Sequence, residues 1–475
     1  MRSAVLCLLF CLLAGACLAD NDSAALAQQP RWQALLHINP GATLRDRHRS
    51  YVDDDAFFLA ATGADDPEAE LRATIEALRP SGAPARCRFP ARYRFVAAHL
   101  GWRDDQPFAH CPDYLQWRAA VHATRAVLVF PAAYLNSPSS MFGHTLMRLD
   151  QGEDSAVWLS WAINFGAVTS AADNSLFYVY RGLAGGYPGR FNLVPYVQKL
   201  QQYSHLESRD IWEYSLDLDQ AQIDWMIDHL WELKDINFDY YFFDENCSFR
   251  LLELIEVARP NTGILDHLRF AELPVRTVRS LDQRDLITDR HYRPSKQVEL
   301  EAISHQLSGE EKTLARRLAD DPALARDAAF KARPAARQAL MVQAAYRYLR
   351  FVHRKDPRTE PLAKRSFQLL RLMSELPPPP PAPALEKAPP EDGHGSQMMA
   401  VSGGQHGSDD FGEFSYRLTY HDLLDNEYGF LDGAQIEGLG LTLRSTESQA
   451  VDLEELQLVS IRSLSPRDQF AKPLN

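Results

Sequence analysis

The segment FDYYFFDENCSFRLLELIEVARP contains the residues best suited to chemistry. Its sequence predicts an aromatic strand over Phe238–Phe243 and a helix that Cys247 opens and that stops before Pro260. A cysteine in the first turn of a helix lies where unpaired backbone N–H groups and the helix dipole stabilise a thiolate. A thiol in that position ionises more readily and becomes a nucleophile. Cys247 is therefore the candidate nucleophile, and the alternative is a buried apolar cysteine.

A nucleophilic thiol also needs a base, and His144 is the best candidate. It lies on a predicted strand, just after the small-residue run NSPSSMFGHT. An imidazole can accept the thiol proton and later donate it to a leaving group. A third polar side chain should fix the imidazole tautomer, and Asn164 and Ser160 are both available on the polar face of the next strand. Four other histidines have weaker contexts and are interpreted as surface or satisfied core residues: His122, His205, His229 and His291.

The N-terminus predicts export. An apolar run over Ala4–Ala16 follows Arg2 and is shorter than the roughly 20 residues that a membrane-spanning helix needs. It suits a signal peptide over residues 1–19, with cleavage after Ala19. Lipid anchoring at Cys17 is the alternative, which is less favoured because Ala14 stands where such motifs usually have leucine.

After cleavage, three cysteines remain: Cys87, Cys111 and Cys247. Two of them should pair in an oxidising compartment. Cys87 and Cys111, 24 residues apart in one polar stretch, are the natural pair, and such a bridge would stabilise the fold by about 3 kcal/mol. Cys247 is then the remaining thiol, which in an exported protein indicates reactivity.

The composition excludes several classes of protein. The chain has 475 residues and a formal net charge of −13, so it has no basic surplus with which to bind nucleic acid. Six cysteines are too few for a disulfide scaffold. The length allows two or three domains. We expect no metal and no other cofactor.

The elements around these residues form an α+β pattern. Residues 20–120 are predicted to be mostly helical. Three aspartates, 53–55, could bind a cation but fit a helix start better. A hairpin is predicted over Met141–Leu149 and Ala156–Phe165, with Val157, Leu159, Trp161, Ile163 and Phe165 on its core face. The glycine-rich RGLAGGYPGRF stretch matches no phosphate-binding motif and predicts a loop near a site. Asp228 and His229 are interpreted as a solvated helix face.

The remaining chain divides into three parts. Residues 263–376 are predicted to be a helical extension, 377–396 a proline-rich linker, and 397–475 a β-strand segment. The last strands are aromatic on one face, as at the start of an outer-membrane barrel, but barely five strands fit before Asn475. Association of this segment with the outer membrane is one hypothesis.

Eight sequence segments resemble one known family. They are WQALLHI, DDDAFFLAATG, CRFPARYRF, CPDYLQWR, NSPSSMFGHTLMRLD, SWAINFGA, YSHLESRDIWEYSLDL and FDENCSFRLLELI, in this order over roughly residues 30–260. Together they resemble the bacterial exported family typified by the Lnb lipoprotein N-acyl transferase. That family resembles circularly permuted papain-like thiol enzymes, such as lecithin:retinol acyltransferase, in which the histidine strand precedes the cysteine helix.

The resemblance assigns roles to particular residues. It implies a permuted papain-like core over residues 121–262, with Cys247 as nucleophile, His144 as base and Asn164 as orienting residue. It also implies that Tyr134, Ser139 and Ser140 line the mouth of the substrate pocket. Glu207 and Arg209 are interpreted as a structural ion pair.

We therefore expect an exported α+β thiol acyltransferase that acts on lipoprotein or lipid acyl groups at the membrane surface, in the periplasm or cell envelope. A cysteine amidase or peptidase acting on cell-wall peptides is the runner-up. The third possibility is a non-catalytic envelope module in which Cys247 is a core residue.

Overall fold

The computed structural model describes most of the chain. The described residues are 23–38, 49–134, 140, 142–152, 157–168, 181–182, 185–241, 245–266, 273–381, 383, 385–407, 409–430, 433–446, 451–464 and 470. The predicted signal peptide and Cys17 lie outside them. The chain forms two compact units. The first unit contains Met1–Val129, Thr145–Val197 and Tyr214–Arg290, and the second contains Phe130–His144, Gln198–Glu213 and His291–Asn475.

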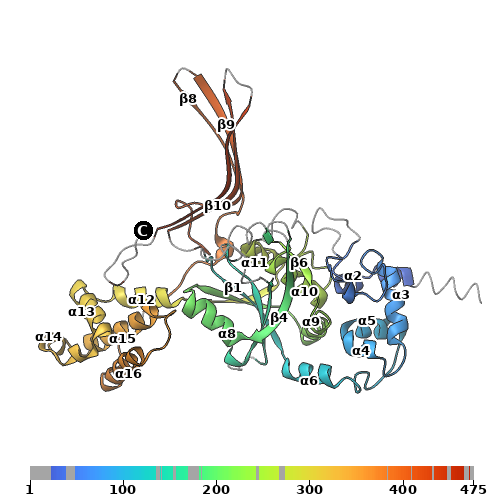
Figure 1. The fold of residues 1–475 in the computed structure, drawn as a ribbon, viewed down its shortest axis with the longest axis horizontal. Helices are drawn as coiled ribbons and strands as arrows, with labels where there is room; N and C mark the ends of the chain where they lie inside the picture. Colours follow the sequence, from blue (N-terminus) through green and yellow to red (C-terminus); the bar gives the residue numbers. More distant parts are fainter. Residues whose placement is uncertain are drawn as a thin grey trace, which may run out of the picture. The chain divides into compact units, whose positions relative to one another are not determined.

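The first unit begins with a cluster of short helices, shown in blue in Figure 1. They are α2 (Pro30–Leu35), η1 (Asp55–Phe57), α3 (Pro67–Leu78), α4 (Pro84–Arg88), α5 (Pro90–Leu100) and α6 (Pro112–Ala120). Each α-helix of this group starts on a proline, whose fixed φ and missing N–H suit the first helical position. At η1, the Asp54 side chain accepts a hydrogen bond from the Ala56 N–H, so this aspartate does start a helix.

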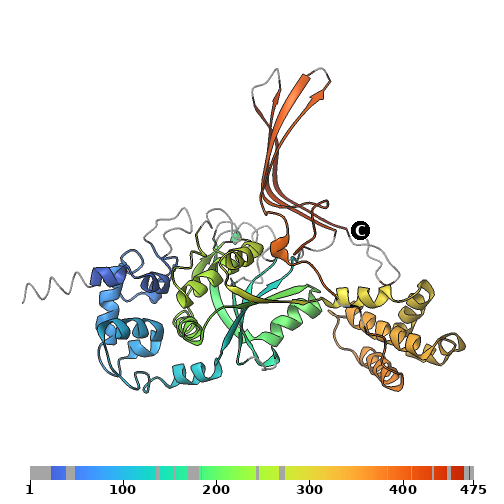
Figure 2. The ribbon, with the colours of Figure 1, turned by 180° about the vertical axis from the view of Figure 1, so that it is seen from behind.

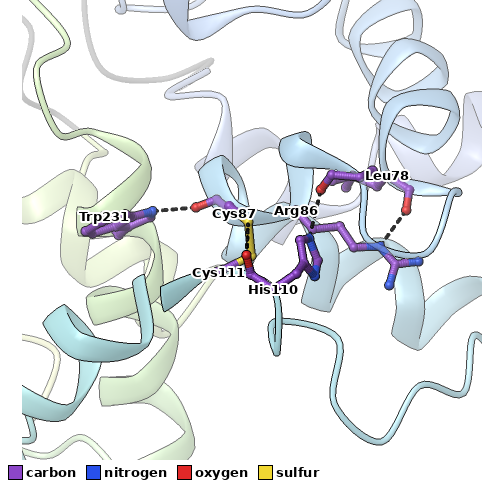
Figure 3. The surroundings of a disulfide bond; sticks show 7 residues. Leu78, Arg86, Cys87, His110, Cys111 and Trp231 are labelled. Atoms are coloured by element: carbon purple, nitrogen blue, oxygen red, sulfur yellow. Dashed lines mark hydrogen bonds between the residues drawn. A yellow bond between two sulfur atoms is a disulfide. The ribbon is translucent and has the colours of Figure 1, made fainter. Parts of the chain in front are cut away.

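A disulfide bond joins Cys87 to Cys111, as predicted, with their Cα atoms 5.1 Å apart. Figure 3 shows its surroundings. The Trp231 indole N–H donates to the Cys87 carbonyl at 2.7 Å, and the Arg86 guanidinium donates to the Leu78 carbonyl at 2.8 Å. The disulfide therefore joins α4 to the start of α6, and the hydrogen bond from Trp231 links Cys87 to the helix that carries Trp231.

A seven-stranded sheet follows, in the order β6-β4-β3-β2-β1-β5-β7. All seven strands lie in the first unit, in whole or in part. They are β1 (Arg125–Pro131), β2 (Leu146–Asp150), β3 (Trp161–Ala167), β4 (Tyr187–Pro195), β5 (Ile211–Leu216), β6 (Phe238–Tyr240) and β7 (Ile287–Arg293). The pairs β1–β2, β2–β3, β3–β4 and β4–β6 are antiparallel. The mixed α+β class is thus confirmed.

Three helices of the first unit accompany this sheet: α9 (Gln220–Glu232), α10 (Cys247–Ala258) and α11 (Pro274–Asp282). A capping box of Asp219 and Gln222 starts α9. Helix α10 contacts β2 and β3 as well as α9 and α2, and Figure 1 shows α9 and α10 beside the strands. Of its twelve residues, only Glu256 is not buried, so α10 is a central helix of this unit.

Three sequence predictions need correction. Residues Val157–Leu159 form a 3-10 helix, β3 starts only at Trp161, and the Trp158 and Leu159 side chains are exposed. The predicted helical extension contains the strand β7. Its polar sequence, ITDRHYR, fits an edge strand, which has a neighbouring strand on one side only. Asp228 and His229 are buried, because buried ionic partners replace solvent at this helix face.

The second unit contains a helical bundle and a second sheet. After α8 (Tyr196–Leu200) and the π-helix η4 (Gln201–Leu206), the bundle consists of α12 (Lys296–His305), α13 (Gly309–Asp320), η5 (Pro322–Arg326), α14 (Ala328–Lys331), α15 (Ala335–Val352) and α16 (Glu360–Glu375). Apolar side chains of α12, α13, α15 and α16 share one core. Figure 2 shows these helices in yellow and orange.

The C-terminal strands form a four-stranded antiparallel sheet in the order β11-β10-β9-β8. After the short helix η6 (Pro390–Asp392) come β8 (Met398–His406), β9 (Asp409–His421), β10 (Ala434–Thr446) and β11 (Asp452–Ser463). Figure 2 shows them as one long, narrow sheet. No helix among the described residues is both long and apolar enough to cross a membrane.

Candidate thiol site

Cys247 is the first residue of α10, as predicted. The side chain of Asn246, at the N-cap, accepts hydrogen bonds from the Ser248 and Phe249 N–H groups at 2.9 and 3.4 Å. Cys247 remains a thiol and is 3% exposed. The cap therefore fixes the start of the helix, and the sulfur is largely shielded from solvent.

Thr145 is a hydrogen-bond partner of this sulfur. Its hydroxyl donates to Cys247 Sγ at 3.7 Å and lies 3.1 Å from the Ser248 hydroxyl. Thr145 is fully buried and immediately precedes β2. The sequence analysis did not single it out, although it directly follows His144 in the chain. The small polar residue after the histidine was the available signal.

His144 was predicted to lie on a strand, but β2 begins only at Leu146, and His144 lies in the second unit, on a tightly constrained loop. Its backbone N–H donates to the Pro131 carbonyl at 3.2 Å, and its side chain is 8% exposed. The preceding residue, Gly143, has φ = +99°, and a Cβ there would lie 2.9 Å from the Phe130 ring. Only glycine fits this position. The backbone that leads into the histidine is thus held in one conformation.

Arg209 supports the same loop from within the second unit. Its guanidinium donates to the Pro131 and Ala132 carbonyls at 2.9 and 2.6 Å, and it pairs with Glu207 at 3.1 Å, as predicted. Tyr203, on the π-helix, has its ring 4.9 Å from the guanidinium carbon and 6.0 Å from the His144 ring. Arg209 and the His144 backbone therefore share the Pro131 carbonyl, and Tyr203 contacts both side chains.

The other predicted site residues are divided between the two units. Asn164 is half-buried in β3, opposite Asn192 of β4. Ser160, the alternative orienting residue, donates its hydroxyl to Asp150 at 2.7 Å. In the second unit, the Tyr134 N–H donates to the Ser140 carbonyl at 2.9 Å, and the Lys355 ammonium donates to the Tyr134 hydroxyl at 3.4 Å. Ser139 lies outside the described residues.

A buried polar network extends from α10 into the N-terminal helices, and the sequence analysis missed it. Arg250 donates to Glu253 at 2.8 Å and to Glu245 at 2.5 Å, and Glu253 lies 3.1 Å from His37 Nδ1. Burial by itself raises the pKa of Glu253, but the charges of His37 and Arg250 outweigh it and lower that pKa. Charged residues within the apolar helix sequence CSFRLLELIEVA were the available signal.

The network continues from His37 to α9. His37 Nε2 lies 3.0 Å from His229 Nε2, and His229 Nδ1 lies 2.9 Å from Glu232. Glu232 in turn accepts the Arg92 backbone N–H at 2.8 Å. All these side chains are at most 2% exposed. Burial lowers the pKa of His229 to about 4, so its ring is neutral at pH 7.

A surface pocket also lies in the first unit. It is lined by Asp53, Asp54, Asp55, Gly185, Gly186, Tyr187, Pro188, Asn237, Phe238 and Asp239. Two of its carboxylates accept hydrogen bonds from the β6 region: Asp53 from the Asp239 N–H and Asp54 from Asn237. Burial raises the pKa of Asp54, but hydrogen bonds from Asn237 and Ala56 outweigh it and lower the pKa. These aspartates therefore position β6.

The fold and the site together define a mixed α+β protein with a shielded thiol at the start of a central helix. Comparison with known families adds that residues 113–284 match the Lnb N-terminal periplasmic domain. Over this range the chain is similar to Lnb-type periplasmic proteins, which supports a location in the periplasm or cell envelope.

Three further family models match the rest of the chain, and each is described as a domain of unknown function. They cover residues 24–99 (DUF7843), 290–385 (DUF7842) and 387–475 (DUF7840). No curated protein and no solved structure matches the chain.

Proposed function

We propose that this protein is a thiol-dependent acyltransferase that acts on acyl groups of lipoproteins or lipids in the cell envelope. Cys247 is the nucleophile, His144 the base and Asn164 the residue that orients the imidazole. The observation that carries the proposal is the contact between the Thr145 hydroxyl and the Cys247 sulfur, because Thr145 directly follows the proposed base in the chain.

The order of the elements supports a permuted papain-like arrangement. The strand that follows His144, β2, pairs with β1 and β3 in an antiparallel sheet. The cysteine helix, α10, comes later in the chain and contacts β2 and β3. This is the order in which the histidine strand precedes the cysteine helix. Thiol chemistry on such a scaffold needs no cofactor.

The first half-reaction makes a thioester. His144 accepts the Cys247 proton, and the thiolate attacks the carbonyl carbon of an ester or amide. A C–S bond forms while the carbonyl electron pair moves to oxygen. We assign the oxyanion to the backbone N–H groups at the start of α10. When the C–O or C–N bond breaks, the imidazolium protonates the leaving group.

The second half-reaction releases the acyl group. An amine or water attacks the thioester carbonyl and gives its proton to His144, the C–S bond breaks, and the thiolate is restored. The match to the Lnb periplasmic domain favours an amine on a lipoprotein as the acceptor. With water as the acceptor, the same steps describe an amidase or peptidase.

Alkylation tests the nucleophile. The folded protein is treated with iodoacetamide between about pH 6 and 7, and Cys247 modification is followed by peptide mass spectrometry. We expect Cys247 to react, and His144→Gln to slow the reaction several-fold, because the variant lacks the base. His291→Gln, on the exposed β7, is the matched control. Urea-unfolded protein gives the rate of a fully accessible thiol.

Absence of alkylation in folded wild-type protein, while the unfolded protein reacts, contradicts both enzyme functions and favours a non-catalytic core cysteine. The substrate is tested separately, by comparing lipoprotein acyl forms by mass spectrometry in cells with wild-type protein and Cys247→Ala. We expect one N-acylated form to disappear in the variant. Identical profiles with a reactive Cys247 would favour the amidase.

A further inference from the structure

Two histidines and an aspartate of the second unit bring their ligand atoms together. His421 is the last residue of β9, Asp425 lies in the loop that follows, and His394 lies between η6 and β8. His394 Nε2 is 2.8 Å from His421 Nδ1 and 3.8 Å from the Asp425 carboxylate. All three ligand atoms lie within 4.8 Å of one another. This cluster is independent of the thiol site.

A hydrogen bond to the backbone fixes the tautomer of His394. Its Nδ1 lies 2.7 Å from the Gly395 carbonyl, which can only accept, so Nδ1 carries the proton and Nε2 presents a lone pair to the cluster. A metal-ligating histidine usually donates its other ring N–H to a carbonyl or carboxylate in this way, which fixes the tautomer and the ring orientation.

His421 is firmly held. It is 1% exposed. Its ring stacks on the Phe430 ring with centroids 3.8 Å apart and planes within 3°. The Asp422 N–H donates to the Asp425 carboxylate at 3.0 Å and orients it toward the cluster.

One other group of three potential ligands occurs among the described residues: Cys87, His110 and Cys111. Its two sulfurs form the disulfide, so they are not thiolates and cannot bind a metal in that state. The cluster of His394, His421 and Asp425 has no such obstacle.

We propose that His394 Nε2, His421 Nδ1 and the Asp425 carboxylate bind one Zn²⁺ ion, with a water molecule as the fourth ligand. Two nitrogens and one carboxylate oxygen favour zinc over magnesium or calcium, which prefer oxygen ligands alone. Tetrahedral ligand atoms at zinc lie roughly 3.3 Å from one another. The two measured distances, 2.8 and 3.8 Å, fall on either side of this value, so small side-chain shifts suffice.

Binding requires one proton to move. In the metal-free cluster the His394 Nε2 lone pair accepts from His421 Nδ1–H, because His394 carries its own proton on Nδ1. On binding, the His421 proton moves from Nδ1 to Nε2, and both facing nitrogens then bind zinc.

The full-length exported chain tests this site. After dialysis against a chelator, Zn²⁺ is titrated in competition with a chromophoric chelator. All variants are made in a Cys247→Ala background, because a thiol also binds zinc. We expect one equivalent to bind, and His394→Ala and Asp425→Asn each to weaken binding at least tenfold. His406→Ala, on the exposed β8, is the matched control and should bind as the parent does. Co²⁺ should give visible absorption bands of a tetrahedral nitrogen and oxygen site.

Two results overturn the proposal: a parent protein that binds no Zn²⁺, or binding that neither variant weakens. The melting temperature is measured for every protein with Zn²⁺ and with chelator. We expect Zn²⁺ to raise it only where the three ligands are intact. If a variant is too unstable to titrate, the rise in the melting temperature of the parent protein with Zn²⁺ still tests the proposal.

Discussion

At the scale of single residues, the environment of Cys247 decides what its sulfur can do. The sulfur is shielded from solvent, accepts a hydrogen bond from the Thr145 hydroxyl, and starts a helix that Asn246 caps. A hydrogen bond to sulfur and a nearby helix N-terminus both favour the thiolate over the thiol. Burial acts in the opposite direction. Thr145 is the residue whose substitution separates these effects, because the Asn246 cap of the helix stays in place.

We predict that Thr145→Val slows alkylation of Cys247 several-fold near neutral pH and lowers the free energy of unfolding by about 1 kcal/mol. The valine is nearly isosteric but lacks the hydroxyl that contacts Cys247 and Ser248, and a lost buried hydrogen bond has about this effect. Alkylation rates and urea unfolding measure the two quantities.

The matched control for this prediction is Thr74→Val in α3. Thr74 is also fully buried, and its hydroxyl has no hydrogen-bond partner among the described residues. Its removal should therefore leave both the alkylation rate and the stability nearly unchanged. Equal effects of the two substitutions would show that Thr145 does not act on the sulfur.

At the scale of elements, α10 is positioned by charges as well as by apolar packing. Arg250 and Glu253 lie inside an otherwise apolar helix and connect it, through His37, to α9. Removing one partner of a buried ionic network leaves another charge unpaired, which costs several kcal/mol. We infer that this network fixes α10, and with it Cys247, against α9 and the N-terminal helices.

The network predicts loss of stability in acid. The folded-state pKa of His229 is about 4, whereas an unfolded histidine titrates near 6.5, so the unfolded chain binds this proton first as the pH falls. The contribution is fully present at pH 7 and is lost between about pH 6.5 and 4. It amounts to roughly 3 kcal/mol of unfolding free energy.

Urea unfolding between pH 4.5 and 7.5 measures this effect, and His229→Gln should remove most of the dependence in that range. His291→Gln, on the exposed β7, should behave as the wild type does. A pH dependence that is unchanged in His229→Gln would show that this ring is not the titrating group. Glu253 also has a lowered pKa and contributes in the same direction, but at lower pH.

At the scale of the whole molecule, the sequence segments of the two units alternate. The loop that carries His144 and the π-helix that carries Tyr203 belong to the second unit, although the sequence on both sides belongs to the first. The edge strand β11 of the C-terminal sheet also exposes several large apolar side chains: Leu453, Leu456, Leu458, Val459 and Ile461. An exposed apolar edge strand is a site at which proteins associate.

We predict that the purified chain binds the hydrophobic dye ANS in its native state, and that a Leu456→Lys, Leu458→Lys double variant lowers the native-state fluorescence several-fold. The two leucines are 63% and 66% exposed. Leu115→Lys, at a separate exposed position on α6, is the control and should change little. If the double variant still binds the dye as the parent does, the apolar surface that binds ANS lies elsewhere in the protein.

The sequence by itself determined the local features of this protein. The helix that begins at Cys247, the Cys87–Cys111 bond, the Glu207–Arg209 ion pair and the capping box at Asp219 all depend on residues close together in the chain. The match to the Lnb periplasmic domain over residues 113–284 contains the motifs from NSPSSMFGHTLMRLD onward. The first three motifs lie instead in the match over residues 24–99 to a domain of unknown function. Such features are readable because neighbouring residues meet in any fold that forms the local structure.

Only the tertiary structure decided which distant residues meet. Thr145 and Cys247 are 102 positions apart, and His37 and His229 are 192 apart. Asp228 and His229 looked solvated because a polar helix position is normally exposed, and buried partners from other helices reversed this. The polar edge strand β7 likewise takes its conformation from the sheet that it joins. Long-range pairing decides these cases, because burial and charge pairing depend on the assembled core and not on local periodicity.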